Sequence, residues 1–411
     1  MDMDREEKTV VALTGCSHAF NHGYQLIYPA VLLLLQKEFS LGYLELGVIG
    51  NIMTFTYGLG ALPGGLVYNR FGPKRLYVFC FLGSAVALLL VAFSPSFLFF
   101  AAGLALLGGV GSVYHPLVNA LITGKVRQYG RALGIHGSAG NVGFALAPVA
   151  AGLIASRFGW RHAYGWFALS GIGLSLWALS VDMSPREGST FVKNSGTTKT
   201  RAFPNLRRYF TLPLVCLYLA NTLNSFCYFG AITFLPTYMA KRTSFNIFSF
   251  DSVALGGMLT GVVLSMGVFG QFAGGLLSQK SHLERSFLVI SIFAFPFIFL
   301  MSFVTNLLLV VLALGYFFFN FLLQPMANTL LAQHTTPDMR GPAFGLFFFI
   351  AFCIGSVASS FSGLIAQAFG LQWVFLGLSS SAFLLIFFAV LLSNTKNPAP
   401  SSHGSGTGGT L

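Results

Sequence analysis

The stretch GLIASRFG at residues 152–159 returns almost unchanged as GLIAQAFG at residues 363–370, 211 positions further along the chain. Three more matches keep the same order at nearly the same spacing: HPLVNALI (115–122) with QPMANTLL (324–331), GRALG (130–134) with GPAFG (341–345), and GGL (64–66) with GGL (274–276). Repetition at one fixed spacing indicates a fold made of two similar units.

The composition places both units in a membrane. Of 411 residues, 55% are hydrophobic and 8% are charged, whereas a soluble domain carries about 25% charge. The apolar residues form twelve runs long enough to cross ~30 Å of hydrocarbon. These runs lie near residues 11–36, 43–69, 75–94, 97–123, 132–156, 161–182, 209–240, 252–279, 286–303, 305–334, 342–368 and 371–393. We therefore expect an all-α membrane protein with twelve transmembrane helices in two pseudo-symmetric six-helix bundles.

The segments outside these runs are short. We expect an N-terminal bundle over residues 1–182, a cytoplasmic central loop over 183–208, a C-terminal bundle over 209–394 and a tail over 395–411. The tail is rich in Ser, Gly and Thr, which predicts a flexible, disordered end. The head MDMDREEKTV is charged and lacks the layout of a signal peptide.

The distribution of positive charge predicts the orientation. The segments on the side of the N-terminus carry 18 Lys and Arg, and the loops on the other side carry 5. Because positive residues collect in cytoplasmic loops, both termini are expected in the cytoplasm of a multi-pass inner-membrane protein. The same bias accounts for the net charge of +12 without a nucleic-acid partner. The five cysteines fall within apolar runs, with spacing that suits neither zinc nor disulfides, and are interpreted as small core residues.

Two glycine-containing motifs support a transporter. The loop GGLVYNRFGPKR (64–75) resembles the cytoplasmic loop signature of the major facilitator superfamily, with Asn in place of its usual Asp. The positions concerned are Gly65, Asn69, Arg70, Gly72, Lys74 and Arg75. The fifth run, GNVGFALAPVAAG (140–152), resembles the antiporter motif of exporters in that superfamily, at Gly143, Ala147, Pro148 and Gly152. Two parallel six-helix repeats also describe this superfamily, whose substrate sites lie near the membrane midplane between the halves.

Histidines and amides are the polar groups placed deep in the runs, and no carboxylate is placed near a midplane. At 1.5 Å per residue, His18 and His22 lie roughly 10 and 16 Å into the first run, on one helix face. The resemblance places the first, second, fourth and fifth helices around the cavity. The expected substrate and proton cavity therefore includes His18, Asn21, His22, His115, Asn119, His136 and Asn141 from the first half. The second half adds Asn221, Asn224, Gln271, Asn320, Gln324 and Asn328.

The first half also resembles the fosmidomycin-resistance branch of that superfamily. The resemblance rests on SHAFNHG (17–23), VYHPL (113–117) and GSAGNVGFALAP (137–148). Two positions depart from the branch pattern: His22 stands where the branch has Asp, and Leu117 where it has Glu. Without these acids, the resemblance implies a neutral or anionic solute rather than a cationic drug, with coupling by histidine or no coupling.

We expect a monomeric secondary transporter that exports a small neutral or anionic organic solute by alternating access, coupled to protons. No catalytic motif supports an enzyme, and no cofactor or resident metal is expected. Uptake or facilitated diffusion of an organic anion is an alternative, as is a transporter-like sensor that moves nothing. Metal transport is a further option, because imidazole suits Zn, Cu and Ni.

Overall fold

The computed structural model describes residues 3–60, 70–184, 186, 206–245 and 249–395. Within these ranges the regular structure is helical. The first half contains α1 (Arg5–Glu38), α2 (Tyr43–Leu59), α4 (Pro73–Ala92), α5 (Phe97–Gly111), α6 (Tyr114–Lys125), α7 (Tyr129–Phe158) and α8 (Trp160–Ser180). The second half contains α10 (Leu212–Arg242), α11 (Ser252–Leu264), α12 (Met266–Leu277), α13 (Leu283–Leu300), α14 (Asn306–Gln333), α15 (Pro337–Cys353), α16 (Val357–Phe369) and α17 (Val374–Ser393). Short 3-10 turns lie at Leu206–Tyr209 (η1) and Leu371–Trp373 (η2).

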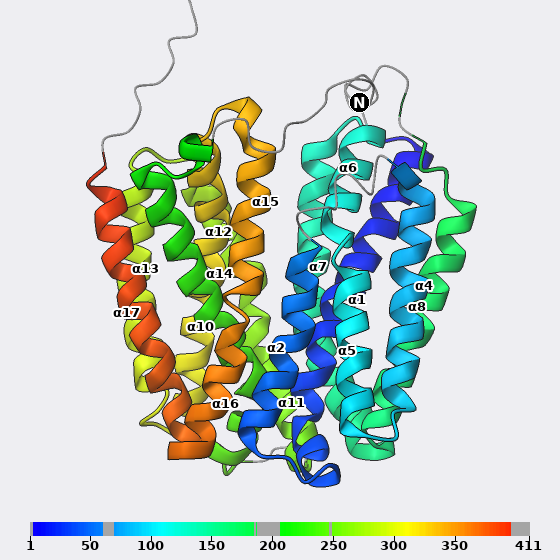
Figure 1. Ribbon diagram of the computed structural model, residues 1–411, viewed down its shortest axis with the longest axis vertical. Helices are drawn as coiled ribbons and strands as arrows, with labels where there is room; N and C mark the ends of the chain where they lie inside the picture. Colours follow the sequence, from blue (N-terminus) through cyan, green and yellow to red (C-terminus); the bar gives the residue numbers. More distant parts are fainter. Residues whose placement is uncertain (1–2, 61–69, 185, 187–205, 246–248, 396–411) are drawn as a thin grey trace, which may run out of the picture.

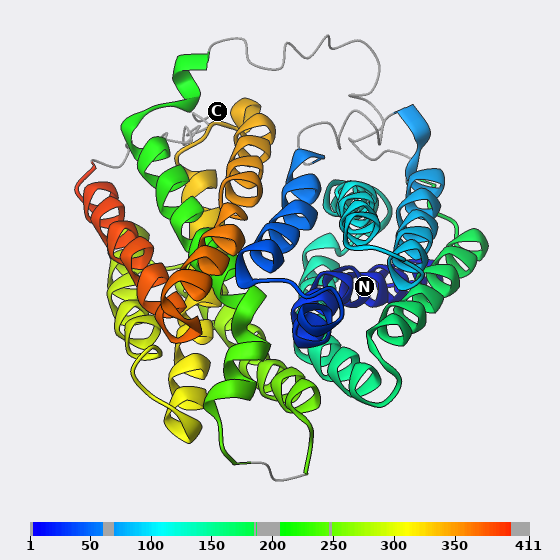
Figure 2. The same ribbon diagram turned by 60° about the horizontal axis from the view of Figure 1, so that its bottom comes forward.

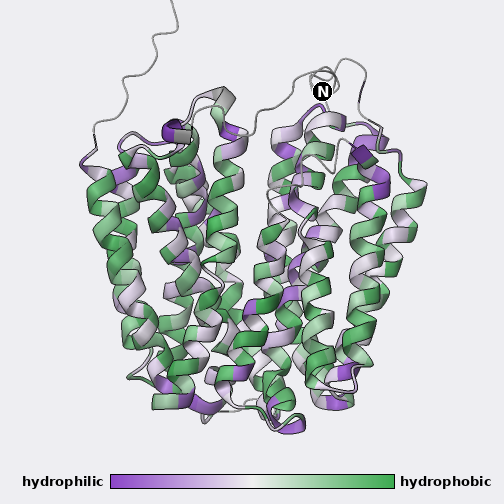
Figure 3. Ribbon diagram, viewed as in Figure 1, coloured by the Kyte–Doolittle hydropathy of each residue, from purple (hydrophilic) through white to green (hydrophobic). Residues whose placement is uncertain are grey.

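These helices form two bundles that stand side by side (Figure 1). Three pairs, α5 with α6, α11 with α12 and α15 with α16, are each one span with a short break, so the described residues make twelve membrane-crossing units, as the sequence predicts. By length and hydropathy alone, nine described segments qualify as spans. The three others are α1 with its histidines, α2 with 17 described residues, and α8. Hydrophobic residues cover the flanks, and hydrophilic residues gather at the two ends and between the bundles (Figure 3).

The first helix begins earlier than its apolar run. Asp4 caps α1 by accepting a hydrogen bond from the backbone N–H of Glu7 at 2.9 Å, and the Glu7 carboxylate accepts one from the N–H of Asp4 at 3.2 Å. Glu7 is buried, and it also accepts a hydrogen bond from the N–H of Arg127 at 2.8 Å. Part of the charged head is therefore helical and is tied to the segment between α6 and α7.

The two bundles meet mainly through α7 against α11 and α2 against α16, and Figure 2 shows α2 beside α15 and α16. Hydrogen bonds close the side opposite the start of α1. The N–H of Leu44 donates to Gln367 at 3.0 Å, and the Ser156 hydroxyl donates to Asp251 at 2.7 Å. On the side of the N-terminus the ribbons of the two bundles stand further apart (Figure 1). The structure therefore has one closed side, with the halves diverging toward the other.

Four of the five cysteines are buried, as expected of small core residues, but Cys16 is exposed. It lies four residues from Ala12 and four from Phe20, which are also exposed. Residues spaced by four share one face of a helix, so Cys16 lies on the outward stripe of α1 rather than in the core.

Candidate functional site

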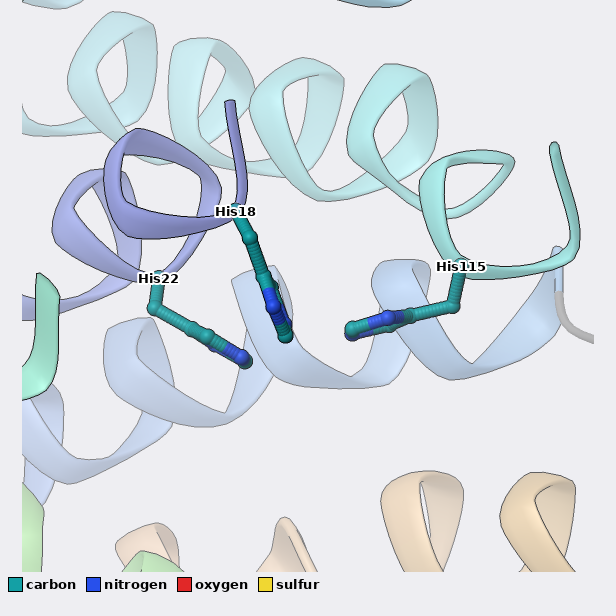
Figure 4. A group of neighbouring side chains, drawn as sticks. All are labelled: His18, His22 and His115. Atoms are coloured by element: carbon teal, nitrogen blue, oxygen red, sulfur yellow. The ribbon is translucent and has the colours of Figure 1, made fainter. Parts of the chain in front are cut away.

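The four histidines expected in the first half lie together. His18 and His22 come from α1, His115 from the first turn of α6 and His136 from α7. The ring centroid of His18 is 4.6 Å from that of His22, 5.2 Å from that of His115 and 4.0 Å from that of His136. Figure 4 shows the rings of His18, His22 and His115 pointing toward one another. The structure thus joins residues up to 118 positions apart into one imidazole cluster.

Backbone carbonyls orient two of these rings. Nδ1 of His18 donates to the carbonyl oxygen of His136 at 2.8 Å, and Nδ1 of His136 donates to the carbonyl oxygen of Thr14 at 3.0 Å. A carbonyl oxygen can only accept a hydrogen bond, so each of these Nδ1 atoms carries a proton. In a neutral ring, Nε2 then holds a lone pair. For His18 that Nε2 atom is buried, and no hydrogen-bonding partner for it lies in the described part of the chain.

Close helix packing makes this arrangement possible. A Cβ on Gly140 of α7 would stand 2.6 Å from Cε1 and Nδ1 of His18, and a Cβ on Gly143 would stand 2.2 Å from the carbonyl oxygen of Ala19. Glycine at both positions lets α7 approach α1 closely enough for the His18 ring to lie against it. The sequence predicted the histidines, but Gly140 could be recognised as their support only from the structure.

Aromatic and hydroxyl groups complete the cluster. The ring of His22 stacks on Phe144 at 4.0 Å between centroids, and the ring of Tyr57 lies 6.2 Å from that of His115. Asn21 is buried and donates to the Tyr57 hydroxyl at 3.1 Å. Sequence reasoning did not include Phe144 or Tyr57, because aromatic residues at helical spacing are common throughout an apolar chain.

Side-chain amides join the two halves, beginning at Asn141, which follows Gly140 in α7. Asn141 of α7 donates to Gln271 of α12 at 3.1 Å, and Gln271 donates to Gln324 of α14 at 2.9 Å. This chain of three side-chain amides crosses from one half to the other. A second group lies within the second half, where Asn320 donates to Asn224 at 2.9 Å.

Three expected cavity residues are placed differently. Asn119 is exposed on α6, Asn221 is buried in α10, and Asn328 of α14 is half-buried with its Oδ1 lacking a partner among the described residues. Within the described residues, no hydrogen bond joins these side chains to the histidines or to the amide chain, so their inclusion in the site stays a prediction.

A cavity between the halves adjoins the cluster. It is lined by Gln25, Met53, Thr54 and Phe144 from the first half and by Tyr228 and Thr233 from the second, among others. Phe144 belongs to both features, because its ring stacks on His22 and lies 6.3 Å from the ring of Tyr228.

The residues of the fifth-run motif divide between two contacts. Gly143 packs on Ala19, and the Cβ of Ala147 is 3.3 Å from the Cβ position of Gly23, both on α1. Pro148 and Gly152 instead face α11: a Cβ on Gly257 would stand 2.4 Å from the carbonyl oxygen of Pro148 and 3.2 Å from Cα of Gly152. One face of the motif therefore packs on α1, which carries His18 and His22, and a second face of α7 packs on α11 of the other half.

The loop motif is described only in part, since Gly65 and Asn69 lie outside the described residues. Gly72 has φ of +75°, which favours glycine, and it precedes α4, where Pro73 takes the first position. Lys74 donates to the carbonyl oxygen of Leu179 at 3.1 Å, so it ties α4 to the end of α8. Arg70 and Arg75 are exposed.

Comparison with known proteins places this chain in a family. The model of the Major Facilitator Superfamily matches residues 12–360 and, a second time, residues 250–409. The chain belongs to this superfamily of transporters, and this membership indicates a transporter rather than an enzyme.

Individual relatives agree with this class. The chain is 26% identical over 384 residues to the fosmidomycin resistance protein of Escherichia coli, covering 89% of this chain and 88% of that protein. It is 26% identical over 267 residues to the probable sulfoacetate transporter SauU of Cupriavidus necator, covering 61% and 59% of the two chains. Among solved structures, a bacterial homologue of the human lysosomal transporter Spinster, described as inward-facing and occupied, superposes with a TM-score of 0.81 at 15% identity. That match covers 97% of this chain and 100% of the other. The protein is thus a multi-pass membrane transporter that moves small-molecule solutes.

Proposed function

We propose that the protein exports a small neutral or anionic organic solute across the inner membrane in exchange for protons, as a monomer working by alternating access. The observation that carries the proposal is the chemistry of the site. The histidine cluster of the first half adjoins a cavity between the halves through Phe144, which lines the cavity and stacks on His22. A chain of amides crosses from Asn141 of the first half to Gln271 and Gln324 of the second. Every Asp and Glu among the described residues lies within a few positions of a helix end. No described carboxylate therefore lies at mid-helix, beside the histidine cluster, to attract a cationic solute there.

Orientation follows from charge. The excess of Lys and Arg on the side of the N-terminus, 18 against 5, supports cytoplasmic termini. In that orientation the closed side, with Leu44 and Gln367, faces outward. The halves then diverge toward the cytoplasm, which is the state in which an exporter loads its solute.

The direction of transport is supported by relatives. Besides the fosmidomycin resistance protein, a multidrug resistance protein of Citrobacter koseri is 32% identical over 164 residues, covering 38% of this chain and 39% of that protein. The exporter-type motif on α7, at Pro148 and Gly152, supports the same direction. A second candidate, uptake or facilitated diffusion of an organic anion, is favoured by the similarity to SauU.

Proteoliposome flux tests the proposal, with fosmidomycin and sulfoacetate as probe solutes. Export coupled to protons predicts solute movement that depends on an imposed pH gradient. Movement without a gradient supports the carrier alternative, and no movement of either probe under any gradient supports a transporter-like sensor.

Replacing the histidines tests the site. His22→Ala and His115→Ala are each expected to reduce flux at least about tenfold, equivalent to ~1.4 kcal/mol, because each removes an imidazole of the proposed site. The matched control is His162→Ala, since His162 is an exposed histidine on α8. Insertion and elution on size exclusion should be unchanged in all three variants. Unchanged flux in both cluster variants contradicts the assignment of this site.

A further inference from the structure

His18, His22 and His115 have the arrangement of a metal-binding site. Each ring offers one nitrogen, and these three nitrogens lie within 4.8 Å of one another. His18 and His22 are one helical turn apart on α1, and His115 approaches from α6 (Figure 4). Three imidazoles without a carboxylate form a ligand set that suits Zn²⁺, Ni²⁺ and Cu²⁺ rather than Mg²⁺ or Ca²⁺.

Two ring nitrogens of the cluster also lack hydrogen-bonding partners among the described residues. Nε2 of His18 and Nδ1 of His22 are both buried, and neither has a partner among the described residues. A buried polar atom left unpaired costs about 1–3 kcal/mol. His18 itself is only 8% exposed. A cation bound between the rings would give such atoms a partner, and the rings of His18 and His22 lie 4.6 Å apart between centroids.

The orientation of His18 is also that of a metal ligand. Its Nδ1 donates to the carbonyl oxygen of His136, which leaves a lone pair on the buried Nε2. Metal-binding histidines almost always donate their other N–H to a carbonyl or carboxylate, because this fixes both tautomer and ring orientation. His136 is a positioning residue, since its own Nδ1 is used by Thr14 and its ring stacks flat on His18.

We propose that His18, His22 and His115 bind one divalent late transition-metal ion, with Zn²⁺ as the representative, and leave a fourth coordination position open. Tetrahedral zinc with N ligands at 2.0–2.1 Å needs nitrogens about 3.3 Å apart, so side-chain rotations must bring the three nitrogens closer by up to about 1.5 Å. His115 lies in the first turn of α6, next to the break after α5. This proposal departs from the sequence-based expectation of no metal.

The open position specifies what the ion recognises. Neutral imidazoles leave the full +2 charge on the metal, and no described carboxylate lies nearby to compensate it. An oxygen of an anionic solute is the ligand that completes such a site, as water or substrate completes the three-histidine zinc sites of enzymes. Metal binding itself does not depend on transport, whereas this role in anion recognition rests on the proposed function.

Metal binding is tested on the full-length protein purified in detergent without a polyhistidine tag and stripped with a chelator. Isothermal titration with Zn²⁺ should give one ion per chain, and Co²⁺ should produce the intense visible absorption of a tetrahedral site. His22→Gln and His115→Gln should each weaken Zn²⁺ binding at least about tenfold, while the control His162→Gln binds like the wild type. Thermal unfolding of the metal-free variants should match the metal-free wild type, which separates lost ligands from lost folding.

The outcomes distinguish this proposal from the proposed function. Absence of stoichiometric Zn²⁺ binding, or binding that persists in both glutamine variants, overturns the metal site whether or not solutes move. Zn²⁺ binding with no flux keeps the metal site and contradicts the transport proposal. Addition of fosmidomycin should change the absorption of the Co²⁺ form, and an unchanged spectrum at saturating fosmidomycin overturns the anion-recognition role.

Discussion

Gly140 of α7 is the position at which one methyl group should disable the histidine cluster. In a Gly140→Ala variant the new Cβ would stand 2.6 Å from Cε1 and Nδ1 of His18 and 2.9 Å from Nε2. These distances are shorter than carbon atoms tolerate, so the His18 ring must swing away from α7. Its 2.8 Å hydrogen bond to the carbonyl oxygen of His136 and its parallel stack on that ring would then be lost.

The expected change in the free energy of unfolding is the sum of opposing contributions. Overpacking costs about 1–3 kcal/mol, and the lost hydrogen bond costs about 1 kcal/mol. Alanine in place of glycine within a helix returns up to about 1 kcal/mol. The net expectation is a destabilisation of about 1–4 kcal/mol from these three terms. Flux should fall by more than the loss of folded protein accounts for, because the displaced ring no longer faces His22 and His115.

The matched control is Gly137→Ala, three residues earlier on the same helix, where a new Cβ would meet nothing within 4 Å. It should be as stable as the wild type or slightly more so, with normal flux. The measurements are thermal unfolding in detergent and flux in proteoliposomes. If Gly140→Ala behaves like Gly137→Ala in both, the packing argument for the cluster is wrong.

Two further predictions concern the closed side and the surface. Gly363→Ala would place a Cβ 2.3 Å from the carbonyl oxygen of Tyr43, so it should weaken closure of that side and lengthen spin-label distances across it. Gly275→Ala, where a Cβ meets nothing within 4 Å, should leave the spin-label distances unchanged. Equal distances in the two variants would contradict the role of the contact between Gly363 and Tyr43 in closing that side. Asp182 accepts a hydrogen bond from Lys125, which lowers the pKa of the Asp182 carboxyl. Its contribution to stability is therefore complete above the ordinary Asp pKa and is lost as the pH falls through the lowered value. Asp182→Asn should cost at most about 1 kcal/mol at pH 7, because the Asp182 side chain is exposed to solvent. The difference in unfolding from the wild type should shrink in strong acid, and a difference independent of pH would refute the role of the ion pair.

Sequence alone predicted the fold well because its two strongest signals are independent of tertiary detail. The repeat of GLIASRFG as GLIAQAFG indicates two similar units, and the lengths of the apolar runs indicate membrane spans. Helix ends were less predictable. Hydropathy does not register a cap such as Asp4, which extends α1 into charged sequence. The breaks after α5 and α11 are equally invisible, since Ser112 and Ser265 interrupt no apolar pattern.

Helix periodicity alone predicted the candidate site only within single helices, and the expectation that histidines from three helices share one cavity came from the resemblance to the superfamily. The spacing of His18 and His22 by four residues implies a shared face, and their rings lie 4.6 Å apart. That His115 joins them depends on how closely α1, α6 and α7 approach, which is determined by contacts such as Gly143 with Ala19. Periodicity within one helix carries no information about such contacts. The assignment of these residues to a substrate site stays a prediction for the flux measurements.

The contacts of the proposed site are of two kinds, within the first half and between the halves. The histidine cluster is held by contacts within the first half, where Gly140 and Gly143 of α7 pack on α1. The amide chain crosses between halves, from Asn141 to Gln271. Rocking of one half against the other must break the amide hydrogen bonds between the halves, and it can leave the contacts between α1 and α7 intact. The imidazoles would therefore keep one geometry in both states while their amide partners change. If the cluster binds the solute as proposed, a solute that also contacts the amides would lose those contacts when the halves rock, and its release would follow the change of state.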